Sequence, residues 1–165
     1  MKTKTIELNR VREVLAYDKN TGVFTWNEKP KQWRKGKSNI AGSLNTNGYL
    51  RIKVDGARYG AHRLAWFYVY GEWPKNDIDH IDGCRTNNAI SNLRNVSRTV
   101  NMQNIRTAYS TNNVGVLGVS KKCNKWKAQI RLEGKNKHLG WFDAPELAHQ
   151  AYLNAKRVHH EGCCI

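Results

Sequence analysis

Residues 77–105 read DIDHIDGCRTNNAISNLRNVSRTVNMQNI, a run that concentrates Asp, His and Asn and holds few other charged residues. Asp79 and His80 end a short extended segment, and the Asp82-Gly83 dipeptide after it favours a tight turn. Taken alone, such a pair is typical of a capped, hydrogen-bonded turn. The pair also supplies a carboxylate and a titratable imidazole, which are common catalytic groups, so we interpret the run as an active site.

A second strand and a helix are expected after the turn. Residues 93–96 read as a short strand, Ser97 is a candidate N-cap, and neither Gly nor Pro occurs from there to Ile105. Asn101 would then lie one turn into a helix that faces the strand of Asp79. The predicted order is strand, loop, strand and helix.

Charge indicates the class of partner. The 165 residues hold 28 Lys and Arg against 13 Asp and Glu, a net charge of +15 with a pI near 9.9. This balance favours a polyanion, either nucleic acid or an acidic membrane surface. Six Trp, seven Tyr and 39% hydrophobic residues favour one or two small folded domains over a disordered tail.

Targeting signals and cysteine motifs are missing from the sequence. No run approaches the roughly eighteen apolar residues of a membrane helix, and the N-terminal MKTKTIELNR lacks the apolar core of a signal peptide, so we expect a soluble, cytoplasmic protein. The cysteines form no C-x-x-C pair, which argues against a zinc ribbon, and we interpret them as free thiols. The vicinal Cys163-Cys164 pair could alternatively form a disulfide or bind a metal.

The spacing of the polar residues resembles the HNH homing-endonuclease family and its ββα-metal (His-Me finger) motif. Asn92 follows His80 by twelve residues and Asn101 follows it by twenty-one. The similarity covers about residues 49–106. It implies an enzyme that hydrolyses DNA phosphodiester bonds, by nicking or by cutting both strands, encoded by a phage or a mobile element and acting in a bacterial host cell.

The resemblance also implies a role for each polar residue. His80 would be the general base, and Asn92 would brace the loop. Asp79 and Asn101 would bind one divalent cation, Mg²⁺ or Mn²⁺. The chemistry is consistent with these roles, because a neutral imidazole can take a proton from water and Mg²⁺ needs only one or two protein oxygens once DNA adds its phosphate.

A helix, a small sheet and a second helix are expected before residue 77. Residues 6–17 place apolar side chains at helical spacing, and residues 23–26 read as a strand. Residues 62–70, HRLAWFYVY, read as a buried helix that ends at Gly71. His62 at its start is interpreted as a helix-start or core histidine, with an approach to the metal or the DNA as the alternative.

Residues 31–59 carry seven basic side chains and a single acid, Asp55. Glycines divide this segment into short strands, which should place the cations on one face and Ile52 and Val54 on the other. An ordinary solvated sheet face is the alternative to a phosphate-binding one. The residues predicted to bind DNA here are Lys35, Lys37, Arg51, Lys53 and Arg58.

Residues 107–113, TAYSTNN, predict a linker between a nuclease domain at 1–106 and a second domain at 114–165. Three strands are expected in the second domain, at 114–120, 125–133 and about 136–142. A helix that starts with a capping box, Asp143 with Glu146, should cover the sheet. The side chains expected to cover it are Ala144, Leu147, Ala148, Ala151, Tyr152, Ala155 and Val158.

The middle strand of this module alternates apolar residues with hydrogen-bond donors, which suits DNA. The module resembles the APETALA-type DNA-binding domain of plant ethylene-response factors through Gly118-Val119, residues 126–131, residues 139–142 and the Ala-rich helix. In the plant domains the sheet lies in the major groove, but His138 stands where Trp is usual, so base specificity is not transferred. The predicted DNA-binding residues are Lys121, Lys122, Lys125, Lys127, Gln129, Arg131, Lys137 and His138. A small domain that only packs is the alternative.

These inferences together predict an α+β protein. It would have an N-terminal helix and small sheet, a ββα-metal core and a C-terminal three-stranded antiparallel sheet packed on one helix. The expected partner is double-stranded DNA, bound by a monomer and without a membrane. The main alternative is a sequence-specific DNA-binding regulator without cleavage activity, and an RNA-binding protein is a weaker one because no single-strand recognition motif is found.

Overall fold

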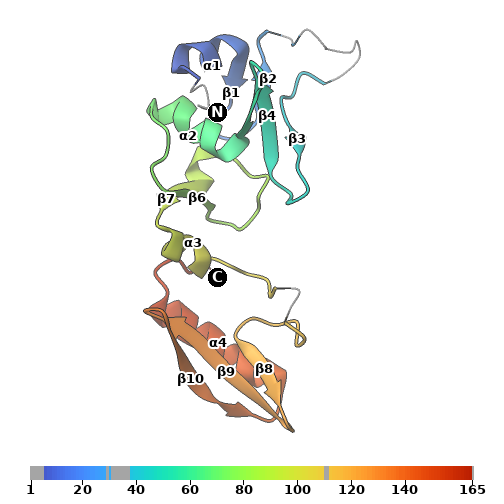
Figure 1. Cartoon of the computed structure of the whole chain (residues 1–165), viewed down its shortest axis with the longest axis vertical. Helices are drawn as coiled ribbons and strands as arrows, with labels where there is room; N and C mark the ends of the chain where they lie inside the picture. Colours follow the sequence, from blue (N-terminus) through green and yellow to red (C-terminus); the bar gives the residue numbers. More distant parts are fainter. Residues whose placement is uncertain (1–5, 29, 31–37, 110–111, 165) are drawn as a thin grey trace. The chain divides into compact units, whose positions relative to one another are not determined.

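The computed structural model describes residues 6–28, 30, 38–109 and 112–164, and it divides into two compact units, residues 1–96 and 97–165 (Figure 1). Each unit is described by itself. No helix among these described residues is long and apolar enough to cross a lipid bilayer. Lys35 and Lys37, predicted to bind DNA, lie outside the described residues.

The N-terminal unit is built from short elements joined by turns. They are α1 (Leu8–Val14), β1 (Leu15–Tyr17), β2 (Phe24–Trp26), β3 (Ser43–Leu44), β4 (Leu50–Val54), β5 (Ala57–Gly60), α2 (Ala61–Tyr70), β6 (Asp77–His80), a 3-10 turn (Ile90–Asn92) and β7 (Leu93–Val96). The strands form three antiparallel sheets, with orders β1-β2, β3-β4-β5 and β6-β7.

The core of this unit forms around α2 and β4. Leu64 and Ala65 of α2 are fully buried, and Ile52 and Val54 of β4 are 1% and 3% exposed. The intervening cations of β4 are exposed, so the predicted alternation of the strand is confirmed. α2 ends as predicted at Gly71, which has a left-handed backbone with φ 77°.

The helix predicted for residues 6–17 is too long. α1 ends at Val14, and the chain turns directly into β1, where Leu15 pairs with Trp26 of β2. Leu15 is fully buried, and a buried apolar side chain at this position fits either the end of an amphipathic helix or the start of a strand. The spacing of apolar residues therefore could not show where α1 ends. The helix ends at Val14 because Leu15 pairs with Trp26 of β2.

The β1-β2 hairpin packs against the loop that follows β6. Tyr17 donates a hydrogen bond from its hydroxyl to the Asn88 carbonyl at 2.7 Å, and the Ile90 amide donates to the Lys19 carbonyl at 3.0 Å. Gly22 has φ 73°, and a Cβ there would lie 2.2 Å from the backbone of Asn88 and Ala89. The hairpin tip thus touches the loop backbone directly.

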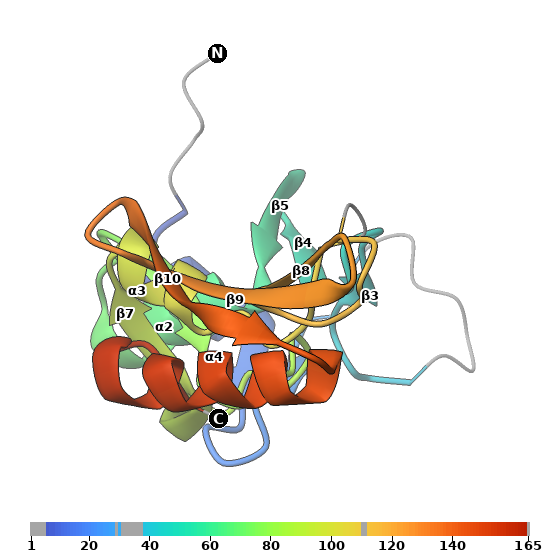
Figure 2. The same cartoon turned by 90° about the horizontal axis from the view of Figure 1, so that it is seen from below.

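The C-terminal unit contains α3 (Arg98–Gln103), β8 (Val119–Lys122), β9 (Lys125–Leu132), β10 (Lys135–Phe142) and α4 (Pro145–His159). The strands form an antiparallel sheet in the order β10-β9-β8, and α4 lies along one face of it (Figure 2). Ala128 and Ile130 of β9 are buried, as are Ala148 and Tyr152 of α4. The predicted three-stranded sheet packed on one helix is therefore confirmed, although β8 begins at Val119, five residues later than expected.

Two details of α4 were predicted wrongly. Its N-cap is Ala144, without a side-chain hydrogen bond, because Asp143 pairs with Lys125 of β9 instead of forming a capping box. Leu147 and Val158 are 57% and 76% exposed. A three-stranded sheet covers a narrow stripe of a helix, and these two side chains lie outside the stripe.

Lys156 occupies a covered position of α4 and is 1% exposed. Its amine donates to the Ile105 carbonyl at 2.6 Å, and burial lowers its pKa. The long aliphatic stem allows a lysine to fill an apolar position while its amine finds a carbonyl, which a polar-apolar pattern does not reveal.

The short helix α3 is held by contacts at both ends. The Ser97 side chain accepts a hydrogen bond from the Val100 amide, which confirms the predicted N-cap. From the chain's tail, the Gly162 amide donates to Gln103 Oε1 at 2.9 Å, and a Cβ on Gly162 would lie 2.1 Å from the Val100 carbonyl oxygen. Arg106 also donates to the Cys164 carbonyl at 2.8 Å.

Replacing Gly22 with Ala should destabilise the protein by more than about 2 kcal/mol, because the new methyl group meets backbone atoms that cannot rotate away. Gly56→Ala is the matched control, since Gly56 also has a positive φ, 85°, but a Cβ there meets nothing within 4 Å. That variant should lose only about 1 to 2 kcal/mol, from backbone strain. Urea unfolding followed by circular dichroism measures both, and equal losses would contradict the contact.

Candidate active site

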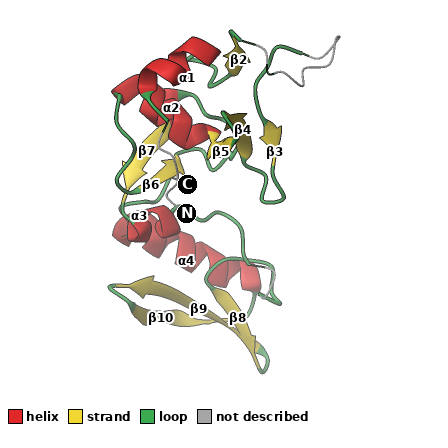
Figure 3. Cartoon of the chain, turned by 45° about the horizontal axis from the view of Figure 1, so that its top comes forward, coloured by secondary structure: helices red, strands yellow, loops and turns green. Residues whose placement is uncertain are grey.

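The β6-β7 hairpin (Figure 3) carries Asp79 and His80 at the end of β6. Asp79 pairs with Arg94 across the hairpin, and His80 pairs with Leu93. Asp79 and His80 are 6% and 5% exposed. Because neighbouring residues of a strand point to opposite faces, the carboxylate and the imidazole leave the hairpin on different sides.

The tautomer of His80 is determined by Asn88. His80 Nε2 lies 3.2 Å from Asn88 Oδ1, and Asn88 Nδ2 donates to the Thr86 carbonyl at 3.2 Å, which fixes the orientation of the amide. A carbonyl oxygen only accepts hydrogen bonds, so Nε2 carries the proton and Nδ1 keeps its lone pair. The imidazole is thus arranged to accept a proton at Nδ1.

His80 is also kept neutral by its surroundings. Burial lowers its pKa, against smaller raising effects from the hydrogen bond with Asn88 and from the charges of Asp82 and Asp79. A neutral imidazole is the form that can act as a general base.

Asn92 spans the loop between the two strands. Its Oδ1 accepts from the Asp82 amide at 3.0 Å, and its Nδ2 donates to Asp82 Oδ1 at 2.9 Å and to the Asn87 carbonyl at 2.8 Å. Burial would raise the pKa of Asp82, but hydrogen bonds from Asn87, the Cys84 amide and Asn92 lower it. The loop therefore closes around an ionised carboxylate.

Arg94 holds Asp79 in place. Its Nε and Nη2 lie 2.8 Å and 2.7 Å from Asp79 Oδ2, and the Asp79 side chain is only 7% exposed. Sequence reasoning missed this pair, although a cation directly opposite an acid in a hairpin is a recognisable cross-strand signal. Sequence reasoning also missed the contact of Asn88 with His80. Asn is common in loops because it tolerates irregular backbone, so its presence there does not by itself indicate a functional role.

The described residues offer few protein ligands for a divalent cation. Among the described residues, no three His, Cys, Asp or Glu side chains gather into a metal site. One oriented carboxylate still fits Mg²⁺ or Mn²⁺, because Mg²⁺ keeps several waters and uses substrate phosphates as ligands. Asp79 is therefore the residue of the N-terminal unit suited to the metal.

The predicted site residues fall into two groups. Asp79, His80 and Asn92 come together in the N-terminal unit around the β6-β7 loop. Asn101 lies on α3 in the C-terminal unit, where its backbone N–H donates to the Ser97 carbonyl. The shared metal site of Asp79 and Asn101 stays a prediction.

His62 lies beside His80, with ring centroids 5.4 Å apart, and Tyr49 lies 5.4 Å from His62 and 6.0 Å from His80. Burial lowers the pKa of His62 to about 4, so its ring is neutral. Its Nδ1 is buried without a hydrogen-bond partner in the described part of the chain. His62 is thus at a helix start, as interpreted, and next to the candidate base as well.

Cations line the β3-β4-β5 sheet. Arg51 and Lys53 of β4 and Arg58 of β5 are exposed, and Lys53 pairs directly with Arg58 across the strands. Directly paired residues share a face, so these two side chains lie together.

Strand pairing in the C-terminal sheet shows on which face each predicted DNA-binding residue lies. Lys125, Lys127, Gln129 and Arg131 alternate with the buried Ala128 and Ile130, and their partners Lys122 and His138 share the face that α4 leaves open. Lys121 pairs with Trp126, and Lys137 pairs with Ile130, so both lie on the face that carries the helix. Lys121 places its amine 5.3 Å from the Trp126 ring.

Comparison with known proteins gives three similarities. A family model described as HNH endonuclease matches residues 59–103. Protein 3.8 of Escherichia phage T7 is 33% identical over 101 residues, which cover 59% of this chain and 83% of that protein. The HNH homing endonuclease I-HmuI, solved in a study of its DNA binding and cleavage, matches 95% of this chain and 93% of its own, with 18% identity and a TM-score of 0.45.

Asn88→Ala should remove the tautomer preference of His80, because the variant has no acceptor for the Nε2 proton. Asn88→Asp is the matched variant, since a carboxylate oxygen accepts the same hydrogen bond. The ¹⁵N chemical shifts of the His80 ring distinguish the two: protonated Nε2 and unprotonated Nδ1 in the wild type and in Asn88→Asp, and a mixture in Asn88→Ala. Unchanged ring shifts in Asn88→Ala would contradict this assignment.

Proposed function

Because the chain belongs to the HNH endonuclease family, we propose that it is a divalent-metal-dependent endonuclease that hydrolyses phosphodiester bonds of double-stranded DNA. The observation that carries the proposal is the geometry of His80, whose Nδ1 keeps a lone pair because Nε2 is bonded to Asn88. A neutral, oriented imidazole has the chemistry that water activation at a phosphate requires, and the carboxylate of the preceding residue, Asp79, is of the kind that binds a divalent cation.

Each residue of the site has a distinct task in this proposal. His80 accepts a proton from water at Nδ1 as the water oxygen attacks phosphorus, and the bond from phosphorus to the leaving oxygen breaks. Asn88 keeps the imidazole in the required tautomer. Asn92 holds the loop closed through Asp82, and Arg94 keeps Asp79 in one orientation.

The proposed cofactor is one divalent cation, Mg²⁺ or Mn²⁺, with Asp79 and Asn101 as its protein ligands. When bound, such a cation stabilises negative charge on the scissile phosphate and on the leaving oxygen. Asp79 supplies a carboxylate and Asn101 an amide carbonyl, both of them hard oxygens of the kind these cations prefer.

DNA recognition is proposed to involve both units. Arg51, Lys53 and Arg58 form an exposed basic face that suits phosphates, which position the protein without reading sequence. The open face of the C-terminal sheet offers Gln129 and Arg131, side chains able to form hydrogen bonds with base edges. The proposed enzyme is of the homing type and cuts or nicks at a recognised site, and two DNA-binding surfaces on one chain are compatible with action as a monomer.

The alternative function is a DNA-binding regulator that does not cut. Incubation with supercoiled plasmid in Mg²⁺ or Mn²⁺ separates the two, because relaxation or linearisation reports phosphodiester hydrolysis directly. EDTA serves as the control, and a mobility shift measures binding in its presence. Binding without cleavage in either metal would leave the regulator as the better description.

His80→Ala should lower the cleavage rate by about 10² to 10⁴, the usual contribution of a general base. DNA affinity should remain within a few-fold, since the buried ring of His80 is not a phosphate contact. His159→Ala, an exposed histidine of α4, is the matched control and should cleave like the wild type. If His80→Ala kept a rate close to the wild-type rate, the base would lie elsewhere, with His62 the next candidate.

Arg131→Ala should weaken binding to a sequence selected from a random library by about 1 to 3 kcal/mol, the contribution of a good base contact. Its affinity for random DNA should fall less. Lys127→Ala on the same face should weaken both alike, because a lysine contact to phosphate carries no sequence information. Fluorescence anisotropy with both duplexes measures the difference, and equal effects of the two variants would exclude Arg131 from base reading.

A further inference from the structure

Arg85 lies in the loop that follows β6, and two contacts fix its side chain although the residue is exposed. Its Nη1 donates to the Asn47 carbonyl at 2.8 Å. Its guanidinium carbon lies 5.1 Å from the centre of the Tyr49 ring, within the range of a cation-π contact. An exposed arginine normally samples many rotamers, and these two contacts restrict the rotamers of Arg85 before any ligand arrives.

The platform under Arg85 belongs to the candidate active site. The Tyr49 ring lies 6.0 Å from the ring of His80 and 5.4 Å from that of His62. Arg85 therefore packs on the same tyrosine ring that neighbours His80, the residue proposed to activate water.

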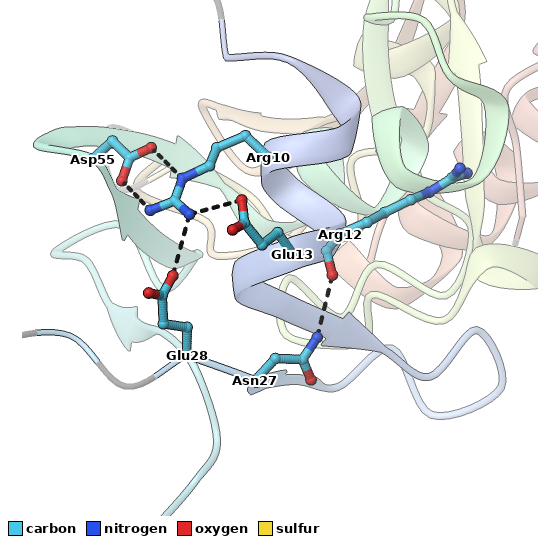
Figure 4. Close-up of polar contacts among 6 residues, drawn as sticks. All are labelled: Arg10, Arg12, Glu13, Asn27, Glu28 and Asp55. Atoms are coloured by element: carbon cyan, nitrogen blue, oxygen red, sulfur yellow. Dashed lines mark hydrogen bonds and ion pairs between the residues drawn. The ribbon is translucent and has the colours of Figure 1, made fainter.

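Arg85 differs from Arg10 and Arg94 of the N-terminal unit in having no acid partner among the described residues. Arg10 is surrounded by carboxylates, with ion pairs to Glu13, Glu28 and Asp55 at 2.9 to 3.1 Å (Figure 4). Arg94 is paired with Asp79. Those positive charges are neutralised inside the fold, whereas the charge of Arg85 is available to an external anion.

We propose that Arg85 is a catalytic residue that binds a non-bridging oxygen of the scissile DNA phosphodiester. This inference rests on the proposed endonuclease function. The guanidinium has five N–H donors, and one of them is used by Asn47, so a fork of donors remains for a phosphate. Because the fork is already oriented, it can stabilise the negative charge that grows on the phosphate oxygens in the transition state.

Arg12 provides a matched control for this residue. Its Nη2 donates to the Tyr68 carbonyl at 2.9 Å, and its guanidinium lies 5.4 Å from the Tyr68 ring, so it has the same two kinds of contact. It too is exposed and has no carboxylate partner among the residues described. Tyr68 packs against Tyr17 and Phe24, and no ring contact joins it to His80 in this part of the structure.

The first experiment measures DNA binding in EDTA, where no cleavage occurs. The affinity for a short mixed-sequence duplex is followed by fluorescence anisotropy across a range of NaCl concentrations. Each lost phosphate contact reduces the slope of log K against log salt by about 0.9, so Arg85→Gln should show this reduction. Arg12→Gln should keep the wild-type slope, and thermal unfolding verifies that both variants are folded.

The second experiment measures plasmid cleavage in Mn²⁺. Arg85→Gln should be slower than the wild type by about 10²-fold or more, as expected for loss of a preorganised donor to the transition state. Arg85→Lys should keep the salt slope but cleave slowly, since lysine keeps the charge and loses the planar fork. Arg12→Gln should cleave like the wild type.

The two experiments separate the possible results. A salt slope unchanged in Arg85→Gln overturns the inference, whether or not the wild type cleaves. A reduced slope with unchanged cleavage also overturns it, because the contact would then be to a remote phosphate. If the wild type does not cleave but Arg85→Gln reduces the slope, the phosphate contact is supported and the endonuclease function fails.

Discussion

The candidate active site depends on the complete burial of one amide, that of Asn88. Its Oδ1 accepts from His80, its Nδ2 donates to the Thr86 carbonyl, and its backbone carbonyl accepts from the Tyr17 hydroxyl. A buried polar group left without a partner costs about 1 to 3 kcal/mol, so these bonds constrain one another. Through Asn88, the packing of the β1-β2 hairpin determines the orientation of a ring on β6.

Some cationic side chains of the N-terminal unit form ion pairs within the fold, and others are exposed to solvent. Arg10 and Arg94 each satisfy carboxylates, and the Arg94 pair is partly buried, where unpaired charge would be expensive. Arg51, Lys53 and Arg85 instead remain exposed on the N-terminal unit. A net charge of +15 repels itself within a compact fold, and an anionic partner along the exposed cations would relieve that repulsion.

Sequence patterns predicted the helices and strands better than the side-chain contacts between them. Alternation in β4 and β9 and the caps at Ser97 and Gly71 are local signals, and the structure agrees with them. The hydrogen bond from His80 to Asn88 and the ion pair from Asp79 to Arg94 depend on how strands and loops fold back. Residue spacing identified the chemical groups of the site but could not show which neighbours orient them.

The contacts around α3 have a consequence for how this protein is assembled. A six-residue helix is too short to be stable in isolation, and here its ends are held by Ser97 and by the tail at Gly162. The hydrogen bond from the Gly162 amide to Gln103 can form only after the chain has been made through Gly162. During synthesis, α3 therefore gains its second end contact almost sixty residues after its own last residue has been added.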